Sequence, residues 1–277
     1  MKPRAAAFAV FRHLVLLMGA AIMLAPFVWM LLSSLKPPDE IFSTTLRLLP
    51  ERWYAIENYT RAFGKVPLAR YLVNGFVVTA AIFLLQAMFA LPCAYALAKL
   101  RFAGRGALFA LVMLGLLIPP QVPSIPVYIM LYKVGLLNTY GALILPSSIS
   151  VFGIYLMRQF FRTVPDELIQ AARLDGCSEW TIVWRIMLPS ALPALIAFGI
   201  LSFVWNWNDY FWPLLVITDP ELLTPPLGTV YLSNQEAGTD FGPLMAGTAV
   251  ITAPLVIAFL VAQRRFVQGM TMAGLKF

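Results

Sequence analysis

Six long uncharged stretches decide what kind of structure this chain can form. About 20 apolar residues cross the hydrocarbon core of a bilayer as a helix, and each stretch is long enough to do so. The alternating pattern of a barrel is absent and unpaired backbone in lipid is costly, so helices are expected. We therefore predict an all-α, polytopic membrane protein with six transmembrane helices. The stretches are 14–35, 71–98, 107–132, 134–157, 186–208 and 241–263.

Composition and charge support this interpretation. Hydrophobic residues make up 60% of the chain and the mean hydropathy is +0.80, which excludes an ordinary soluble domain. If the N-terminus is cytoplasmic, 13 of the 20 basic residues fall on the cytoplasmic side, and the acidic loop 218–240 falls outside. Both termini are therefore predicted to be cytoplasmic. This distribution explains the net charge of +7 without a nucleic-acid partner.

The first stretch follows a basic start and resembles a secretory signal. It continues through 29–32 without a clear small-residue cleavage site, so we expect it to be a retained first span.

The sequence lacks the motifs of several enzyme classes. No G-x-x-x-x-G-K-[ST], HExxH, CxxC or GxSxG pattern occurs. Cys93 lies in a predicted span and Cys177 in a polar loop, so no disulfide is expected. The single histidine, His13, argues against a histidine metal site. We predict that this chain is not an enzyme and binds neither a metal nor a cofactor itself.

One polar segment, PDELIQAARLDGCSEWTIVWRIMLP at 165–189, separates two of the uncharged stretches. Pro165 suits a helix start, and Gly176 suits the left-handed residue that ends that helix. Ser178 can then cap a second helix. Ala171 and Ala172 leave backbone close to the surface, where another protein can approach it. The segment is thus predicted to be a helix-turn-helix that contacts a partner.

This segment resembles the cytoplasmic coupling loop of ABC importer permeases. The family pattern is Glu-Ala-Ala, a three-residue step to Asp-Gly, and Leu-Pro thirteen residues after the Asp. The resemblance implies a type I ABC importer permease fold, a single permease domain over 1–277, and an ATPase-docking loop at 159–189. Gln170 replaces the usual Glu, which makes a salt-bridge account of docking doubtful. The matching residues are Gln170, Ala171, Ala172, Asp175, Gly176, Leu188 and Pro189.

The resemblance covers nearly the whole chain. The chain is similar to the carbohydrate-uptake branch of these permeases, for example at 34–36, 58–60, 137–140 and 207–209. It implies the permease of an ATP-driven, binding-protein-dependent importer for a sugar, oligosaccharide or sugar derivative in the bacterial inner membrane. Glycerol-phosphate permeases are similar too, so a polyol phosphate is the alternative. The implied partners are a second permease in a heterodimer, two ATPases that bind ATP and Mg, and an extracytoplasmic solute-binding protein. The tail residues Gly269, Gly274 and Lys276 are implied to contact an ATPase.

The end of the fifth stretch holds the candidate translocation path. Asn206 and Asp209 lie roughly one helical turn apart and can bind solute hydroxyls, while Trp205 and Trp207 can pack on sugar faces. The same residues also fit an aromatic belt at the membrane interface.

Four prolines between 119 and 126 are expected to break the third stretch. The break fits either part of an outer gate or a helix that ends early in an external loop.

Two other classes of membrane protein are less consistent with the sequence. An ion-coupled secondary transporter would be expected to place ionisable residues deep in its spans, and none clearly lies there. A membrane-embedded enzyme would need a catalytic constellation, which is absent.

Overall fold

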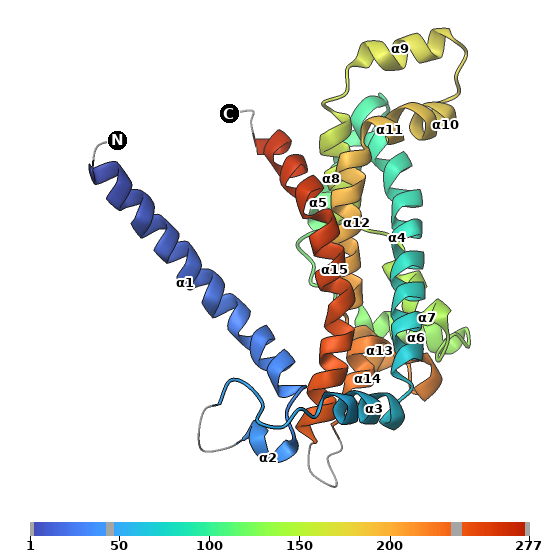
Figure 1. Cartoon of the computed structure of the whole chain (residues 1–277). Helices are drawn as coiled ribbons and strands as arrows, with labels where there is room; N and C mark the ends of the chain where they lie inside the picture. Colours follow the sequence, from blue (N-terminus) through green and yellow to red (C-terminus); the bar gives the residue numbers. More distant parts are fainter. Residues whose placement is uncertain (1–2, 43–46, 234–239, 275–277) are drawn as a thin grey trace. The chain divides into compact units, whose positions relative to one another are not determined.

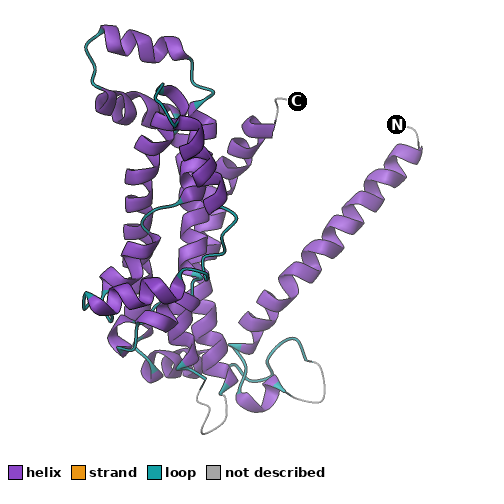
Figure 2. Ribbon diagram, turned by 180° about the vertical axis from the view of Figure 1, so that it is seen from behind, coloured by secondary structure: helices purple, strands orange, loops and turns teal. Residues whose placement is uncertain are grey.

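A computed structural model describes residues 3–42, 47–233 and 240–274, and every regular element in those ranges is a helix (Figures 1 and 2). The described chain divides into two compact units. Unit 1 is Met1–Ala69 with Gly228–Ala253, and unit 2 is Arg70–Leu227 with Pro254–Phe277. The all-α prediction is confirmed.

Unit 1 contains α1 (Pro3–Ser33), α2 (Pro38–Ile41), α3 (Ala55–Lys65) and the first part of α15 (Phe241–Gly274). Asn58 of α3 is buried and its amide donates to the carbonyls of Ser34 and Lys36, at 3.0 and 2.8 Å. Asp240, just before α15, forms ion pairs with Arg61 and Lys65 of α3. These contacts fix α3 against the end of α1 and the start of α15.

Unit 2 contains the remaining helices, apart from the first two residues of α4 and the last three of α14, which fall in unit 1. Gly104 takes a left-handed φ of 81° before α5, and the break predicted from the proline cluster is confirmed between α5 and α6. The helices are α4 (Leu68–Lys99), α5 (Arg105–Gly115), α6 (Ser124–Lys133), α7 (Tyr140–Ile144), η1 (Leu145–Ser147), α8 (Val151–Phe161), α9 (Asp166–Leu174), α10 (Glu179–Ile182), η2 (Val183–Met187), α11 (Leu188–Ser190), α12 (Leu192–Trp207), α13 (Phe211–Val216), η3 (Pro220–Leu222) and α14 (Pro225–Val230).

Among the described residues, three helices are long and apolar enough to cross a membrane unbroken: Val10–Ser33, Leu68–Lys99 and Phe241–Leu260. Two bent pairs raise this number to five: Tyr140–Ser147 with Val151–Phe161, bent by 42°, and Glu179–Ser190 with Leu192–Trp207, bent by 82°. The third predicted stretch consists instead of the short helices α5 and α6. Six crossings therefore stay a prediction.

Two helices of unit 2, α8 and α12, pack closely against each other. Gly153 of α8 lies under the ring of Phe198 of α12, and a Cβ at Gly153 would lie 2.5 Å from Phe198 Cζ. Phe198 is itself buried, with 2% of its surface exposed, so the ring has little room to move. A glycine is needed here because the two helices approach so closely.

We predict that Gly153→Ala destabilises the protein by about 1–3 kcal/mol, because overpacking forces the ring or the helix to shift. Gly106→Ala is the control, since nothing lies within 4 Å of a Cβ at that helical position. Thermal unfolding in detergent measures both variants. Equal melting temperatures for Gly153→Ala and the parent protein would contradict this packing.

Candidate functional site: the 159–189 loop

The helix-turn-helix predicted for the 159–189 loop is present. Pro165 precedes the nine-residue helix α9, and Asp166 and Glu167 occupy its first turn, where they complement the helix dipole. Gly176 ends α9 with a φ of 78°, as predicted. The amide of Cys177 then donates to the carbonyl of Ala172 at 2.9 Å, which closes the turn.

The second helix of the loop begins as predicted. The Ser178 hydroxyl accepts from the amide of Thr181 at 3.2 Å, and Glu179 stands in the first turn of α10. The helix continues through the π-helical segment η2 to α11, and the 82° bend at Ala191 leads into α12. Local sequence signals therefore set both the start and the turn of the loop.

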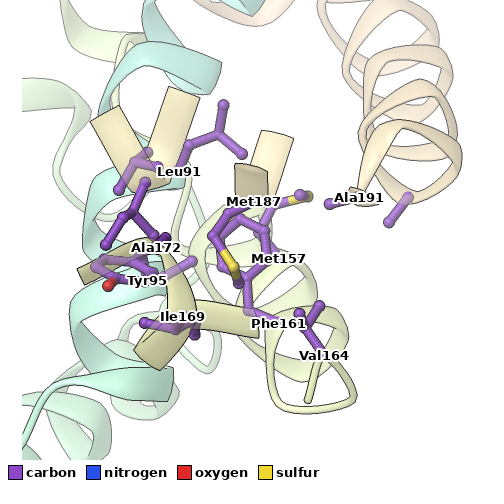
Figure 3. Packing of buried hydrophobic residues seen from close by; sticks show 13 residues of the cluster. Leu91, Tyr95, Met157, Phe161, Val164, Ile169, Ala172, Met187 and Ala191 are labelled. Carbon is purple, nitrogen blue, oxygen red and sulfur yellow. The ribbon is translucent and has the colours of Figure 1, made fainter. Parts of the chain in front are cut away.

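The inner face of the loop packs on the ends of α4 and α8 (Figure 3). Ile169 and Ala172 of α9 lie three residues apart and are 3% and 6% exposed. The cluster that they join contains Leu91, Ala94 and Tyr95 of α4, Met157 and Phe161 of α8, Val164, Ile182 of α10, Val183 and Met187 of η2, Ala191, and Ala194 of α12. The loop is thereby joined to three longer helices of unit 2.

Polar contacts strengthen the attachment to α4. Lys99, the last residue of α4, donates to the carbonyl of Val164 and to Asp166 Oδ1, both at 2.5 Å. This ammonium group holds the pKa of the Asp166 carboxyl below its ordinary value. Tyr95, one helical turn earlier, donates to Glu179 Oε2 at 2.5 Å. Both helices of the loop are thus bonded to the end of one span.

The same carboxylate joins α9 to α10. Arg173 Nε and Nη2 donate to Glu179 at 2.8 and 3.2 Å. This hydrogen bond raises the pKa of Arg173 above its ordinary value. The Arg173–Glu179 ion pair is half exposed, so it contributes little to the free energy of folding. Its main effect is to fix the angle between α9 and α10.

The predicted docking residues divide between two faces. Gln170, Ala171, Asp175, Gly176 and Pro189 are exposed, whereas Leu188 is partly buried against the apolar cluster. Ala172 is buried, so the expectation that its backbone lies open to a partner is corrected: the position faces the spans because it follows Ile169 by three residues on a helix.

The outer face carries apolar residues that the sequence analysis missed. Leu174 is 89% exposed and Trp180 is 64% exposed, although both lie in a predominantly polar loop. Leu168 is 46% exposed on the same helix as Leu174. Leu168 and Leu174 lie on α9 away from the face that carries Ile169 and Ala172, and this spacing could have indicated their exposure. These exposed apolar side chains are candidates for contact with another protein.

The four candidate path residues lie in different surroundings. Asn206 is partly buried and donates to the Ser202 carbonyl at 2.8 Å, and Asp209 Oδ1 accepts from the Trp212 amide at 3.2 Å, at the start of α13. Trp207 is 1% exposed and packs against Phe76 and Phe203, whereas Trp205 is 69% exposed. The four residues do not share one surface.

The remaining site predictions concern the tail and metal binding. Gly269 and Gly274 lie in α15, and Lys276 lies outside the described residues. Within the ranges that the structure describes, no group of three or more His, Cys, Asp or Glu residues could hold a metal ion.

Comparison with known proteins identifies the family. Residues 86–272 match the family described as the binding-protein-dependent transport system inner membrane component, and the chain belongs to that family. The arabinooligosaccharides transport system permease protein AraQ of Halalkalibacterium halodurans is 33% identical and is matched over 93% of this chain and 92% of its own length. The sn-glycerol-3-phosphate transport system permease protein UgpE of Escherichia coli is 31% identical, over 94% and 95%.

The fold has a solved counterpart. A chain in the crystal structure of a bacterial ABC transporter involved in the import of the acidic polysaccharide alginate matches with a TM-score of 0.84 and 23% identity, over 96% of this chain and 99% of that chain. The predicted importer permease fold is confirmed. The protein is therefore a multi-pass permease subunit of the inner membrane, a transport component and not an enzyme.

We predict that Gly176→Val loosens the 159–189 loop, because a β-branched residue resists positive φ at a cost of about 1–2 kcal/mol. Hydrogen exchange of the backbone amides in 166–182 should become faster. Gly176→Asn is the matched control, since asparagine tolerates the left-handed region. Unchanged protection in the valine variant would show that the turn does not hold the loop.

Proposed function

We propose that the outer face of the 159–189 loop docks on an ATPase subunit that drives this permease. The observation that carries the proposal is the division of the loop into two faces. The inner face is packed into the cluster of span ends, while Leu174, Trp180 and Leu168 leave apolar surface open to a partner. The exposed amide of Gln170 can hydrogen-bond to that partner without an ion pair.

The assembly that we propose has two permeases and two ATPases. This chain, as a single permease domain over 1–277 with both termini cytoplasmic, forms half of a heterodimeric pore. The ATPases bind ATP and Mg, and an extracytoplasmic binding protein delivers the solute. Closure of the ATPase pair pulls the two coupling loops together, and the attached spans then change the side to which the pore opens. The tail around Gly269, Gly274 and Lys276 adds a second ATPase contact.

The proposed solute is a sugar or an oligosaccharide. The proposal is supported by the name of the AraQ relative and by the alginate importer whose fold this chain shares. A polyol phosphate is the second candidate, because the UgpE relative is matched over nearly its whole length. Titration of the binding protein from the same gene cluster with a panel of both solute classes tests this choice. Binding of glycerol phosphate alone would reject the sugar assignment.

We predict that Leu174→Ser weakens binding of the ATPase while the permease stays folded, because the change removes exposed apolar surface and no buried contact. Co-purification of the ATPase with the permease and solute-stimulated ATP hydrolysis should both fall. Leu48→Ser, at a residue 60% exposed in unit 1, is the control and should alter neither. Normal co-purification and hydrolysis with Leu174→Ser would reject docking at this face.

We also predict that Asp209→Asn impairs uptake if Asp209 lines the path. The asparagine oxygen can still accept from the Trp212 amide, so this hydrogen bond at the start of α13 survives and only the charge is lost. Asp209→Ala is the comparison, since loss of a hydrogen bond typically costs about 1 kcal/mol of stability. Uptake into liposomes, normalised to assembled complex, decides the matter. Full uptake by Asp209→Asn would exclude a path-lining role.

Orientation has an independent test. Cysteines introduced at Glu221 and at Asp175 should react with an impermeant reagent from opposite sides, Glu221 from outside, since the basic residues favour cytoplasmic termini. The background for both is a chain with Cys93 and Cys177 replaced by alanine. Labelling of both introduced cysteines from one side would overturn the proposed topology.

A further inference from the structure

A buried guanidinium at the end of α8 is not explained by the transport mechanism. Arg158 is 9% exposed, and its Cζ lies 3.6 Å from the centre of the Phe109 ring of α5. Its Nε donates to the carbonyl of Leu97 at 3.1 Å. An arginine has five N–H donors, and this is the one hydrogen bond of the Arg158 side chain within the part of the chain described here. The cation is held in place with most of its donors unused.

A second arginine reaches the same end of α4. Arg105 Nη1 donates to the Leu100 carbonyl at 3.0 Å, and Nη2 lies 3.4 Å from the Ala98 carbonyl. A helix C-terminus carries only about half a negative charge, which one cation is enough to complement. Two guanidiniums at one helix end therefore leave positive charge uncompensated.

Arg162 adds a third cation to this cluster, because it follows Arg158 by four residues at the end of α8, and residues at this spacing are neighbours on a helix. Arg162 is exposed. Across residues 3–42, 47–233 and 240–274, none of the three arginines has a carboxylate within ion-pair distance. Cytoplasmic arginines are common beside membrane spans, but a buried arginine without an acidic partner is costly, and a bound anion would lower that cost.

An apolar surface begins at the same place. Leu108, Leu111 and Leu114 follow Arg105 at three-residue intervals along α5 and are 49%, 61% and 55% exposed. The other face of α5 packs on α8, for example through Gly115 and Val151. The 11 residues of α5 extend roughly 16 Å at 1.5 Å per residue, about half of a 30 Å hydrocarbon core. In length the helix matches one leaflet, and a helix that spans a leaflet from Arg105 inward has its cationic end at the membrane surface.

We propose that Arg105, Arg158 and Arg162 bind the phosphate of an anionic membrane lipid, whose acyl chains lie along the leucines of α5. Guanidinium groups match phosphate oxygens in charge and in the geometry of their paired donors. Basic pockets between spans on the cytoplasmic side bind anionic headgroups in this manner. The bound lipid supplies the negative charge that the described residues do not, and it fixes α5 against α8.

The test measures lipid preference directly. The protein is reconstituted in phosphatidylcholine bilayers with a trace of spin-labelled phosphatidylglycerol or spin-labelled phosphatidylcholine, and the immobilised fraction of each probe is compared. Arg162→Gln and Arg105→Gln should each lower the preference for phosphatidylglycerol about fivefold, the equivalent of one juxtamembrane cation. Arg101→Gln removes the same charge from an exposed residue outside the cluster and should leave the preference unchanged.

Three results would overturn the site. The first is a wild-type preference in both Arg162→Gln and Arg105→Gln. The second is an equal loss in Arg101→Gln, which would indicate general surface attraction. The third is displacement of the lipid probe by inorganic phosphate, which would assign the cluster to a free anion. None of these depends on substitution of Arg158, whose contacts with α4 and α5 belong to the fold.

Discussion

The short helices of the 159–189 loop depend on packing against the spans. Isolated helices below about 12–15 residues are marginal in water; α9 has nine residues, and the segment Glu179–Ser190 that begins with α10 is interrupted by the π-helical η2. Their stability must therefore come from Ile169, Ala172 and Ile182, which are buried in the cluster with α4 and α8. A loop held in this way cannot reorient freely, so force applied to its outer face reaches the spans.

The loop is attached to α8 and α12 by the chain itself, but to α4 only by non-covalent contacts. The attachment to α4 therefore shows best how the fold holds the loop in place. The chain itself connects the loop to α8 and to α12, whereas Tyr95 and Lys99 bind it to α4 through Glu179, Val164 and Asp166. One movement of the loop would thus act on three elements of unit 2 together. The apolar residues on its outer face are exposed, whereas those on its inner face are buried against the spans.

Sequence patterns predicted the local features of this site and not its long-range contacts. Gly176 and Ser178 act on backbone within a few residues of themselves, and both predictions hold in the structure. The Tyr95–Glu179 bond joins residues 84 apart, and no local pattern indicates it. Ala172 was misplaced because its spacing from Ile169 shows that the two residues share a face of α9, but not that α4 and α8 cover that face. The proline cluster correctly indicated a break in the third stretch, but the number of crossings depends on elements that periodicity does not resolve.

The most direct test of the account is whether the loop and α4 move as one body. Spin labels at Glu167 of α9 and Phe89 of α4, both exposed, would report the distance between these elements in the assembled importer. The measurement is made without nucleotide and with a non-hydrolysable ATP analogue, in a chain whose two cysteines are replaced by alanine. We predict the same distance distribution in both states. A shift of the distribution with nucleotide would contradict a rigid attachment of the loop to α4.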